Sequence, residues 1–133
     1  MKLYASIYIG SYEIILKVFQ ITQKKRLKEL DCLRTPIDTA QDIYASGQLK
    51  KETIDRICNV LEDMKRTLVM YRLMDDYQVY AGSTFTAADN RLFAMEQIKL
   101  RTGMKVLALS NSEHRFMSYR AVASQDNFDA MVS

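Results

Sequence analysis

Apolar and polar residues alternate along the first twenty positions, with the period of two that is typical of a β-strand with two distinct faces. In residues 2–9 the apolar positions are Leu3, Ala5, Ile7 and Ile9. Gly10 and Ser11 interrupt the pattern, which then resumes at Ile14, Leu16 and Val18. The pattern predicts two strands that run antiparallel to each other and are joined by a short Gly-Ser turn.

A third strand is predicted over residues 27–35, after a polar turn at residues 22–25. Pro36 ends this strand because proline has no N–H to donate to a neighbouring strand. Residues 37–47 show no clean period, and we predict a connecting loop with about one helical turn there.

The clearest helix is predicted over residues 51–73, where apolar residues recur at alternating spacings of three and four. These residues are Ile54, Ile57, Leu61, Met64, Leu68 and Tyr71. Charged residues occupy the other faces, which is typical of a solvated surface, and we assign them no ligand. The apolar stripe is expected to pack against the preceding strands.

The rest of the chain alternates between strands and helices. We predict strands over residues 77–81 and 104–109, a helix over residues 86–101 that ends at Gly103, and a final helix over residues 110–123. The predicted order is β-β-β-α-β-α-β-α, an α/β fold with a mixed sheet and helices on its faces. Residues 1–133 are expected to form one domain.

Composition narrows the possible functions. The net charge of +3 is too small to predict nucleic-acid binding. Cys32 and Cys58 lie far apart and match no metal or redox spacing, so they are interpreted as reduced thiols. The sequence shows no membrane span and no signal peptide, and we therefore expect a cytoplasmic protein.

Three junctions lie where an open α/β sheet normally binds ligands, at strand ends that lead into turns or helices. They are residues 10–11, 82–84 and 110–113. Exposed backbone N–H groups at such turns suit a phosphate, and helix N-termini attract anions. We expect the three junctions to converge at one edge of the sheet.

Each junction also has a purely structural interpretation. Gly10 can serve only to give the hairpin turn its positive φ, and Ser83 or Thr84 can be only a helix N-cap. Ser110 and Glu113 have the spacing of a capping box, in which each side chain bonds to the other residue's backbone N–H. These interpretations stay open.

Taken together, the three junctions resemble the N-terminal domain of the exopolyphosphatase and guanosine pentaphosphate phosphohydrolase family. Residues 7–12 lie where that family has a strand ending in Asp-Ile-Gly-Ser-Asn. Residues 80–90 parallel its Ala-Thr-Ser-Ala-x-Arg-Glu-Ala-x-Asn segment, and residues 109–115 resemble its Ile-Ser-Gly-x-Glu-Glu-Ala run. The resemblance covers nearly the whole chain and implies a ribonuclease H-like domain of the actin-like ATPase superfold.

The resemblance also implies a function and a set of site residues. The family hydrolyses terminal phosphoanhydride bonds of polyphosphate or guanosine pentaphosphate, usually with Mg²⁺, in a cleft between two domains. It implies that Glu113 activates the attacking water and that Gly10, Ser11 and Ser83 contact phosphate. Thr86, which stands where the family has an arginine, is a fourth candidate for phosphate binding. The family's second domain is expected to be missing from this chain and to supply the metal ligand, and the full-length protein could form a homodimer.

Several residues depart from the family's pattern. Tyr8 replaces the acidic residue before Ile-Gly-Ser, and Thr86 removes a cation that could bind phosphate with two hydrogen bonds. Ala87 and His114 replace two glutamates.

Three hypotheses follow. The chain is one half of a phosphatase that is inactive alone, or a non-catalytic module that binds polyphosphate or a guanosine alarmone, or a structural or dimerising domain without a ligand.

Overall fold

The computed structural model describes residues 2–24 and 26–109. Three strands come first: β1 (Lys2–Ile9), β2 (Glu13–Ile21) and β3 (Leu27–Pro36). They are followed by α1 (Thr39–Ser46), α2 (Lys51–Met70), β4 (Tyr77–Ala81), α3 (Ser83–Thr86), α4 (Arg91–Thr102) and β5 (Val106–Ala108). The predicted helix over residues 110–123 lies outside the described residues.

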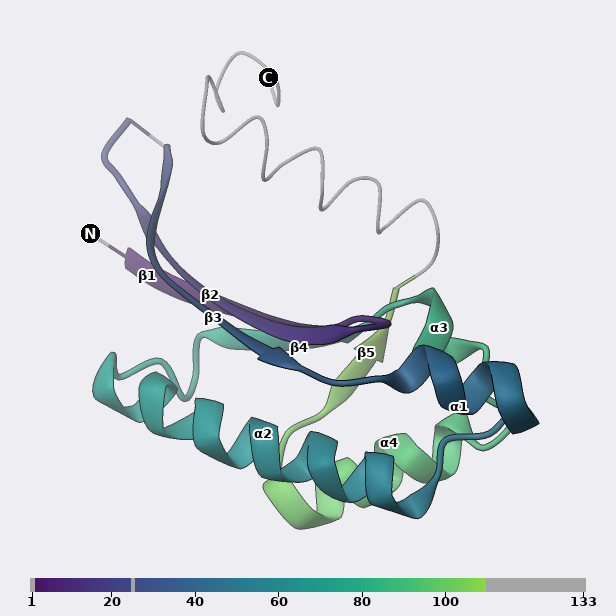
Figure 1. Ribbon diagram of the computed structural model, residues 1–133. Coiled ribbons are helices and arrows are strands. Elements are labelled where there is room, and N and C mark those ends of the chain that lie inside the picture. The colour runs from purple at the N-terminus through teal and green to yellow at the C-terminus, as the bar shows by residue number, and fades with distance from the viewer. Residues whose placement is uncertain (1, 25, 110–133) are drawn as a thin grey trace.

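The five strands form one mixed sheet in the order β3-β2-β1-β4-β5. The pairs β1–β2 and β2–β3 are antiparallel, whereas β1–β4 and β4–β5 are parallel. This is the mixed sheet that the sequence pattern predicted, in the ribonuclease H-like arrangement that the resemblance implied. The helices α2 and α4 lie against one face of the sheet, and α1 and α3 lie at one end of it (Figure 1).

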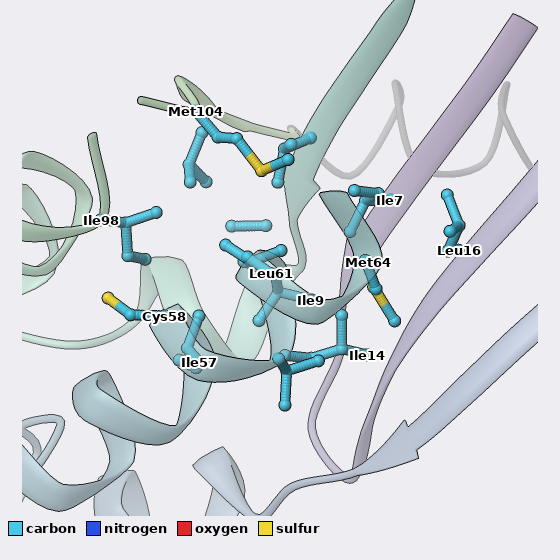
Figure 2. Close-up of a cluster of buried hydrophobic side chains, with 14 of the residues drawn as sticks. Ile7, Ile9, Ile14, Leu16, Ile57, Cys58, Leu61, Met64, Ile98 and Met104 are labelled. Atoms are coloured by element: carbon cyan, nitrogen blue, oxygen red, sulfur yellow. The ribbon is translucent and has the colours of Figure 1, made fainter. Parts of the chain in front are cut away.

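The core lies between this face of the sheet and α2. Ile7 and Ile9 of β1 and Ile14 and Leu16 of β2 are fully buried, because alternate side chains of each strand point to the same face. They face the predicted apolar stripe of α2, as Figure 2 shows for Ile57, Leu61 and Met64. Five of the six predicted stripe residues, Ile54, Ile57, Leu61, Met64 and Leu68, are buried. The sixth residue, Tyr71, is half-buried just beyond the end of the helix.

The prediction of a loop over residues 37–47 was wrong over most of its length, since α1 occupies residues 39–46. The helix begins where the Asp38 carboxylate accepts a hydrogen bond from the Gln41 N–H at 2.9 Å. It ends at Gly47, whose φ of 74° is the left-handed conformation of a helix C-cap. The helix is too short for a clear apolar period, so only these two caps indicate it in the sequence.

The helix predicted over residues 86–101 forms only from Arg91, as α4, and it ends at Gly103 as predicted, whereas residues 83–86 form the separate short helix α3. The chain leaves the helical path between them to pair with the segment before α2. Asn90 bonds to both backbone groups of Leu49, accepting from its N–H at 2.9 Å and donating to its carbonyl at 3.0 Å. The Asp89 N–H donates to the Gly47 carbonyl at 2.8 Å. These tertiary hydrogen bonds outweigh the local helical preference.

Among the described residues no helix combines the length and the apolar character that crossing a bilayer requires.

Candidate functional site

Two of the three predicted junctions meet at one end of the sheet. Because β1 and β4 are adjacent and parallel, their carboxyl ends lie at the same edge, with Ile9 in register with Ala81. The Gly82 N–H donates to the Ile9 carbonyl at 3.0 Å. Beyond the strands, Ser11 Oγ and Thr84 Oγ1 lie 2.5 Å apart and share a hydrogen bond. We call residues 10–12 the first turn and residues 82–84 the second turn.

The first turn is fixed by α1. The Ser11 carbonyl accepts hydrogen bonds from the N–H groups of Thr39 and Ala40, at 3.0 and 3.3 Å. The hydroxyl of Thr39 donates to the carbonyl oxygens of Gly10 and Ser11, at 2.9 and 3.2 Å. Thr39 is fully buried, and sequence reasoning missed it. The first residues of α1 thus donate hydrogen bonds to the carbonyl groups of the first turn. The N–H groups of Thr39 and Ala40 are therefore already hydrogen-bonded.

Gly10 does not have the positive φ expected of a hairpin glycine, so that interpretation was wrong. Its N–H donates to the Glu13 carbonyl at 2.9 Å, which closes the turn. A Cβ at Gly10 would lie 3.2 Å from the same carbonyl oxygen and 3.1 Å from the ring of Tyr8. Glycine is therefore favoured here by lack of space.

The second turn begins the four-residue helix α3. The N-cap is Gly82, so the interpretation of Ser83 or Thr84 as the N-cap was wrong. Ser83 is exposed, and its carbonyl accepts a hydrogen bond from the Thr86 hydroxyl at 3.2 Å. Ser83 and Thr86 thus lie in the single helical turn of α3, next to residues 10–12. Their contact with phosphate stays a prediction.

The side chain of Tyr8 lies between the two turns. A Cβ at Gly82 would overlap the phenol oxygen of Tyr8 and lie 2.9 Å from its Cζ. The ring therefore contacts both turn glycines. Burial raises the pKa of the Tyr8 hydroxyl above its ordinary value, because the charged phenolate is poorly solvated there. Tyr8 is uncharged at neutral pH.

The described residues at this edge do not fit a Mg²⁺ ion, which requires oxygen ligands, usually carboxylates. Glu13 forms an ion pair with Arg34 at 2.7 Å, and Asp38 caps α1. Across the part of the chain that the structure describes, no group of three or more His, Cys, Asp or Glu side chains could hold a metal. Glu113, the predicted general base, lies outside the described residues. The end of β5 that leads toward it does reach this edge, where the Leu109 N–H donates to the Ala81 carbonyl at 3.2 Å.

Comparisons with known proteins place this geometry in a structural context. No model of a protein family and no curated protein sequence matches the chain. Among solved structures, a Ppx/GppA family member from Aquifex aeolicus matches with a TM-score of 0.83 and 23% identity over 92% of this chain. An exopolyphosphatase from Cytophaga hutchinsonii matches with a TM-score of 0.81 and 15% identity over 91% of this chain.

The chain has the fold of the N-terminal part of the Ppx/GppA structures. It spans about two fifths of their length, namely 39% of the Aquifex chain and 38% of the Cytophaga chain. A second Aquifex aeolicus structure, described as a PPX-GPPA enzyme, gives a TM-score of 0.84 with 22% identity over 93% of this chain and 41% of its own. The fold implied by the sequence motifs is therefore confirmed.

Proposed function

We propose that this chain is the N-terminal domain of a phosphatase related to the Ppx/GppA proteins. The single observation that carries the proposal is the meeting of the first and second turns at the carboxyl edge of β1 and β4. Open α/β sheets bind ligands at this edge, and the solved structures of similar fold include an exopolyphosphatase. The proposed substrate class is a phosphoanhydride such as polyphosphate or guanosine pentaphosphate.

In this proposal one wall of the site is lined by four residues of the two turns and α3, namely Gly10, Ser11, Ser83 and Thr86. The hydroxyls of Ser11 and Thr84 already bond to each other, so a phosphate oxygen would compete with or join that hydrogen bond. Glu113 would act as the general base that takes a proton from the attacking water. Mg²⁺, if the reaction uses it, would supply charge neutralisation from ligands outside the described residues.

The chain is proposed to be inactive alone, because phosphoryl transfer depends mainly on positioning and charge neutralisation by both walls of a cleft. Phosphate release from polyphosphate would be measured for the 133-residue chain and for a longer polypeptide carrying the second domain. We expect release only from the longer protein, and a loss of about a hundredfold or more in its Glu113→Gln variant.

The control is Glu96→Gln, which removes an exposed carboxylate from α4 and should leave the rate unchanged. A longer protein that releases no phosphate from polyphosphates or nucleotides with Mg²⁺ would exclude the enzymatic function. Equal rates for Glu113→Gln and the parent protein would exclude the assigned base.

The position of Tyr8 favours a second candidate, a module that binds polyphosphate or a guanosine alarmone without hydrolysing it. Tyr8 places an uncharged ring where the resemblance implies an acidic residue, which would help to hold a cation. Calorimetry on the longer protein separates the two functions. Tight binding without phosphate release, unchanged in Glu113→Gln, supports the binding module, whereas retained binding with lost release supports the enzyme.

A further inference from the structure

The ring of Tyr8 lies across both turns. Its Cε1 would be 3.1 Å from a Cβ at Gly10, and its hydroxyl end occupies the space that a Cβ at Gly82 would need. Tyr8 is half-buried at this edge, one residue from the end of β1. One aromatic side chain thus contacts the backbone of two turns that are more than seventy residues apart in the sequence.

The conformation of Gly82 does not itself require glycine. Its φ of −77° and ψ of −179° are extended values that any residue adopts. The three nearest neighbours of a Cβ at Gly82 all belong to Tyr8, so the ring of Tyr8 occupies the space that a side chain there would need. The sequence therefore combines a large residue at position 8 with the smallest one at position 82.

The described carboxylates at this edge, Glu13 and Asp38, already have other partners. Glu13 is paired with Arg34, and Asp38 caps α1. A ring that fills the space between two turns fixes their separation through packing, and it supplies no charge for a divalent cation.

We infer that Tyr8 is a positioning residue. Its ring holds the first and second turns at a fixed separation, and this wall of the site works without a cation held by β1. The part that concerns phosphate rests on the proposed function, whereas the positioning of the turns does not.

Hydrogen exchange tests the positioning in the ligand-free chain. The N–H groups of Gly10 and Gly82 are each hydrogen-bonded, to Glu13 and Ile9, and so report opening of the turns. In Tyr8→Ala we expect both to exchange at least about tenfold faster, relative to the Leu16 N–H of β2, a strand that is paired on both sides. In Tyr8→Phe, which keeps the ring, both should exchange more slowly than in Tyr8→Ala.

The matched control is Tyr4→Ala, which removes the same side chain from the same face of β1, four residues away. It should leave the relative exchange of Gly10 and Gly82 unchanged. If Tyr8→Ala also leaves it unchanged, or if Tyr4→Ala raises it equally, the positioning role is wrong.

A double variant tests the fit between ring and glycine. Gly82→Ala should raise the exchange of the turn N–H groups in the parent protein, since the new methyl displaces the ring. In Tyr8→Ala the same substitution should have no further effect. Equal effects of Gly82→Ala in both backgrounds would overturn the inference.

Binding experiments test the absence of a cation on β1. With Mn²⁺ alone, a paramagnetic probe, the turn N–H signals of Tyr8→Asp should broaden, and those of the parent protein should not. If the signals of both proteins broaden equally, or if neither broadens, residue 8 does not decide whether a cation binds at this edge. Either result would overturn the inference that this wall lacks a cation because of Tyr8.

Inorganic tripolyphosphate, added in EDTA, should shift the N–H signals of Gly10, Ser11 and Gly82 in the parent protein and in Tyr8→Phe. We expect Tyr8→Ala to bind tripolyphosphate at least about tenfold more weakly than the parent protein does. Binding by Tyr8→Ala as tight as by the parent protein would show that the ring does not position the turns for phosphate. If the parent protein binds no tripolyphosphate, the proposed function fails for this chain, and the exchange and Mn²⁺ results still decide the role of Tyr8.

Discussion

Thr39 connects the first turn to α1 through a single hydroxyl group. The side chain is fully buried, and its Oγ1 donates to the carbonyl oxygens of both Gly10 and Ser11. The Ser11 carbonyl would keep its two backbone donors without this hydroxyl, but the carbonyl of the buried Gly10 would lose the Thr39 donor, which costs more than losing a hydrogen bond at the surface.

Thr39→Val keeps the volume of the side chain and removes the hydroxyl. We expect the free energy of unfolding to fall by about 1–3 kcal/mol, measured by urea denaturation. The N–H signals of Ser11 and Tyr12 should also shift, because the turn loses one of its anchors. The control is Thr53→Val in α2, at a half-buried position, which should change stability by no more than about 0.5 kcal/mol. Equal losses in the two variants would show that the hydroxyl of Thr39 has no special role.

The roles of Thr39 and Tyr8 could not be predicted from the sequence, because each depends on a contact between distant segments. The sequence shows Thr39 as one more polar residue after a proline and Tyr8 as one more residue in an alternating strand. The turns themselves were predictable, since Gly10 and Gly82 follow strands with clear patterns. At Gly10 a glycine was expected for its freedom in φ, whereas in the structure it is lack of space that favours glycine there.

At the level of elements, two helix ends depend on glycines in the left-handed conformation. Gly47 ends α1 with a φ of 74°, and Gly103 ends α4 with a φ of 77°. A Cβ at Gly103 would meet nothing within 4 Å, whereas a Cβ at Gly47 would lie 3.3 Å from Oδ2 of Asp89. The two positions share the same backbone strain and differ in the crowding around them.

Gly103→Ala should therefore lower the free energy of unfolding by about 1–2 kcal/mol, the cost of placing a non-glycine residue in this conformation. Gly47→Ala should lower it further, because the new methyl also presses on Asp89, in the segment that separates α3 from α4. Urea denaturation measures both values. An equal or smaller loss in Gly47→Ala would show that the Asp89 segment gives way without cost.

Long elements with strong periods were predicted well, and so was the short strand β4, whereas the short helices α1 and α3 were not. The stripe of α2 and the alternation in β1 and β2 follow from local sequence alone, because burial of one face dictates the period. The helix α1 and the break between α3 and α4 depend on capping and on the hydrogen bonds of Asn90 to Leu49. Such long-range bonds leave no period in the sequence.

At the level of the whole molecule, the strand order follows from the predicted elements and their connections. Three strands in sequence form the antiparallel part of the sheet, and the strands that follow helices add in parallel to β1 and β4. This arrangement places the carboxyl ends of the parallel strands at one edge, which is why turns far apart in the sequence meet there. The predicted general base Glu113 lies outside the described residues, and the chain spans about two fifths of the similar solved structures.

The buried acidic groups of the domain lead to a prediction about its stability in alkali. Burial raises the pKa of the Cys58 thiol, and it also raises the pKa of the Tyr8 and Tyr77 hydroxyls. A group with a raised pKa stabilises the fold fully below its unfolded pKa, and this contribution is lost as the pH rises through the folded pKa. The free energy of unfolding should therefore start to fall from about pH 9, where an unfolded thiol ionises, and fall more steeply above about pH 10, where unfolded tyrosines ionise.

Urea denaturation in a reducing buffer between pH 7 and pH 11 would measure the curve. In Cys58→Ala the decline should begin about one pH unit later, whatever the absolute cost of the cavity, because the first group to ionise has been removed. A decline that begins at the same pH in both proteins would show that the Cys58 thiol is not the group whose ionisation first weakens the fold.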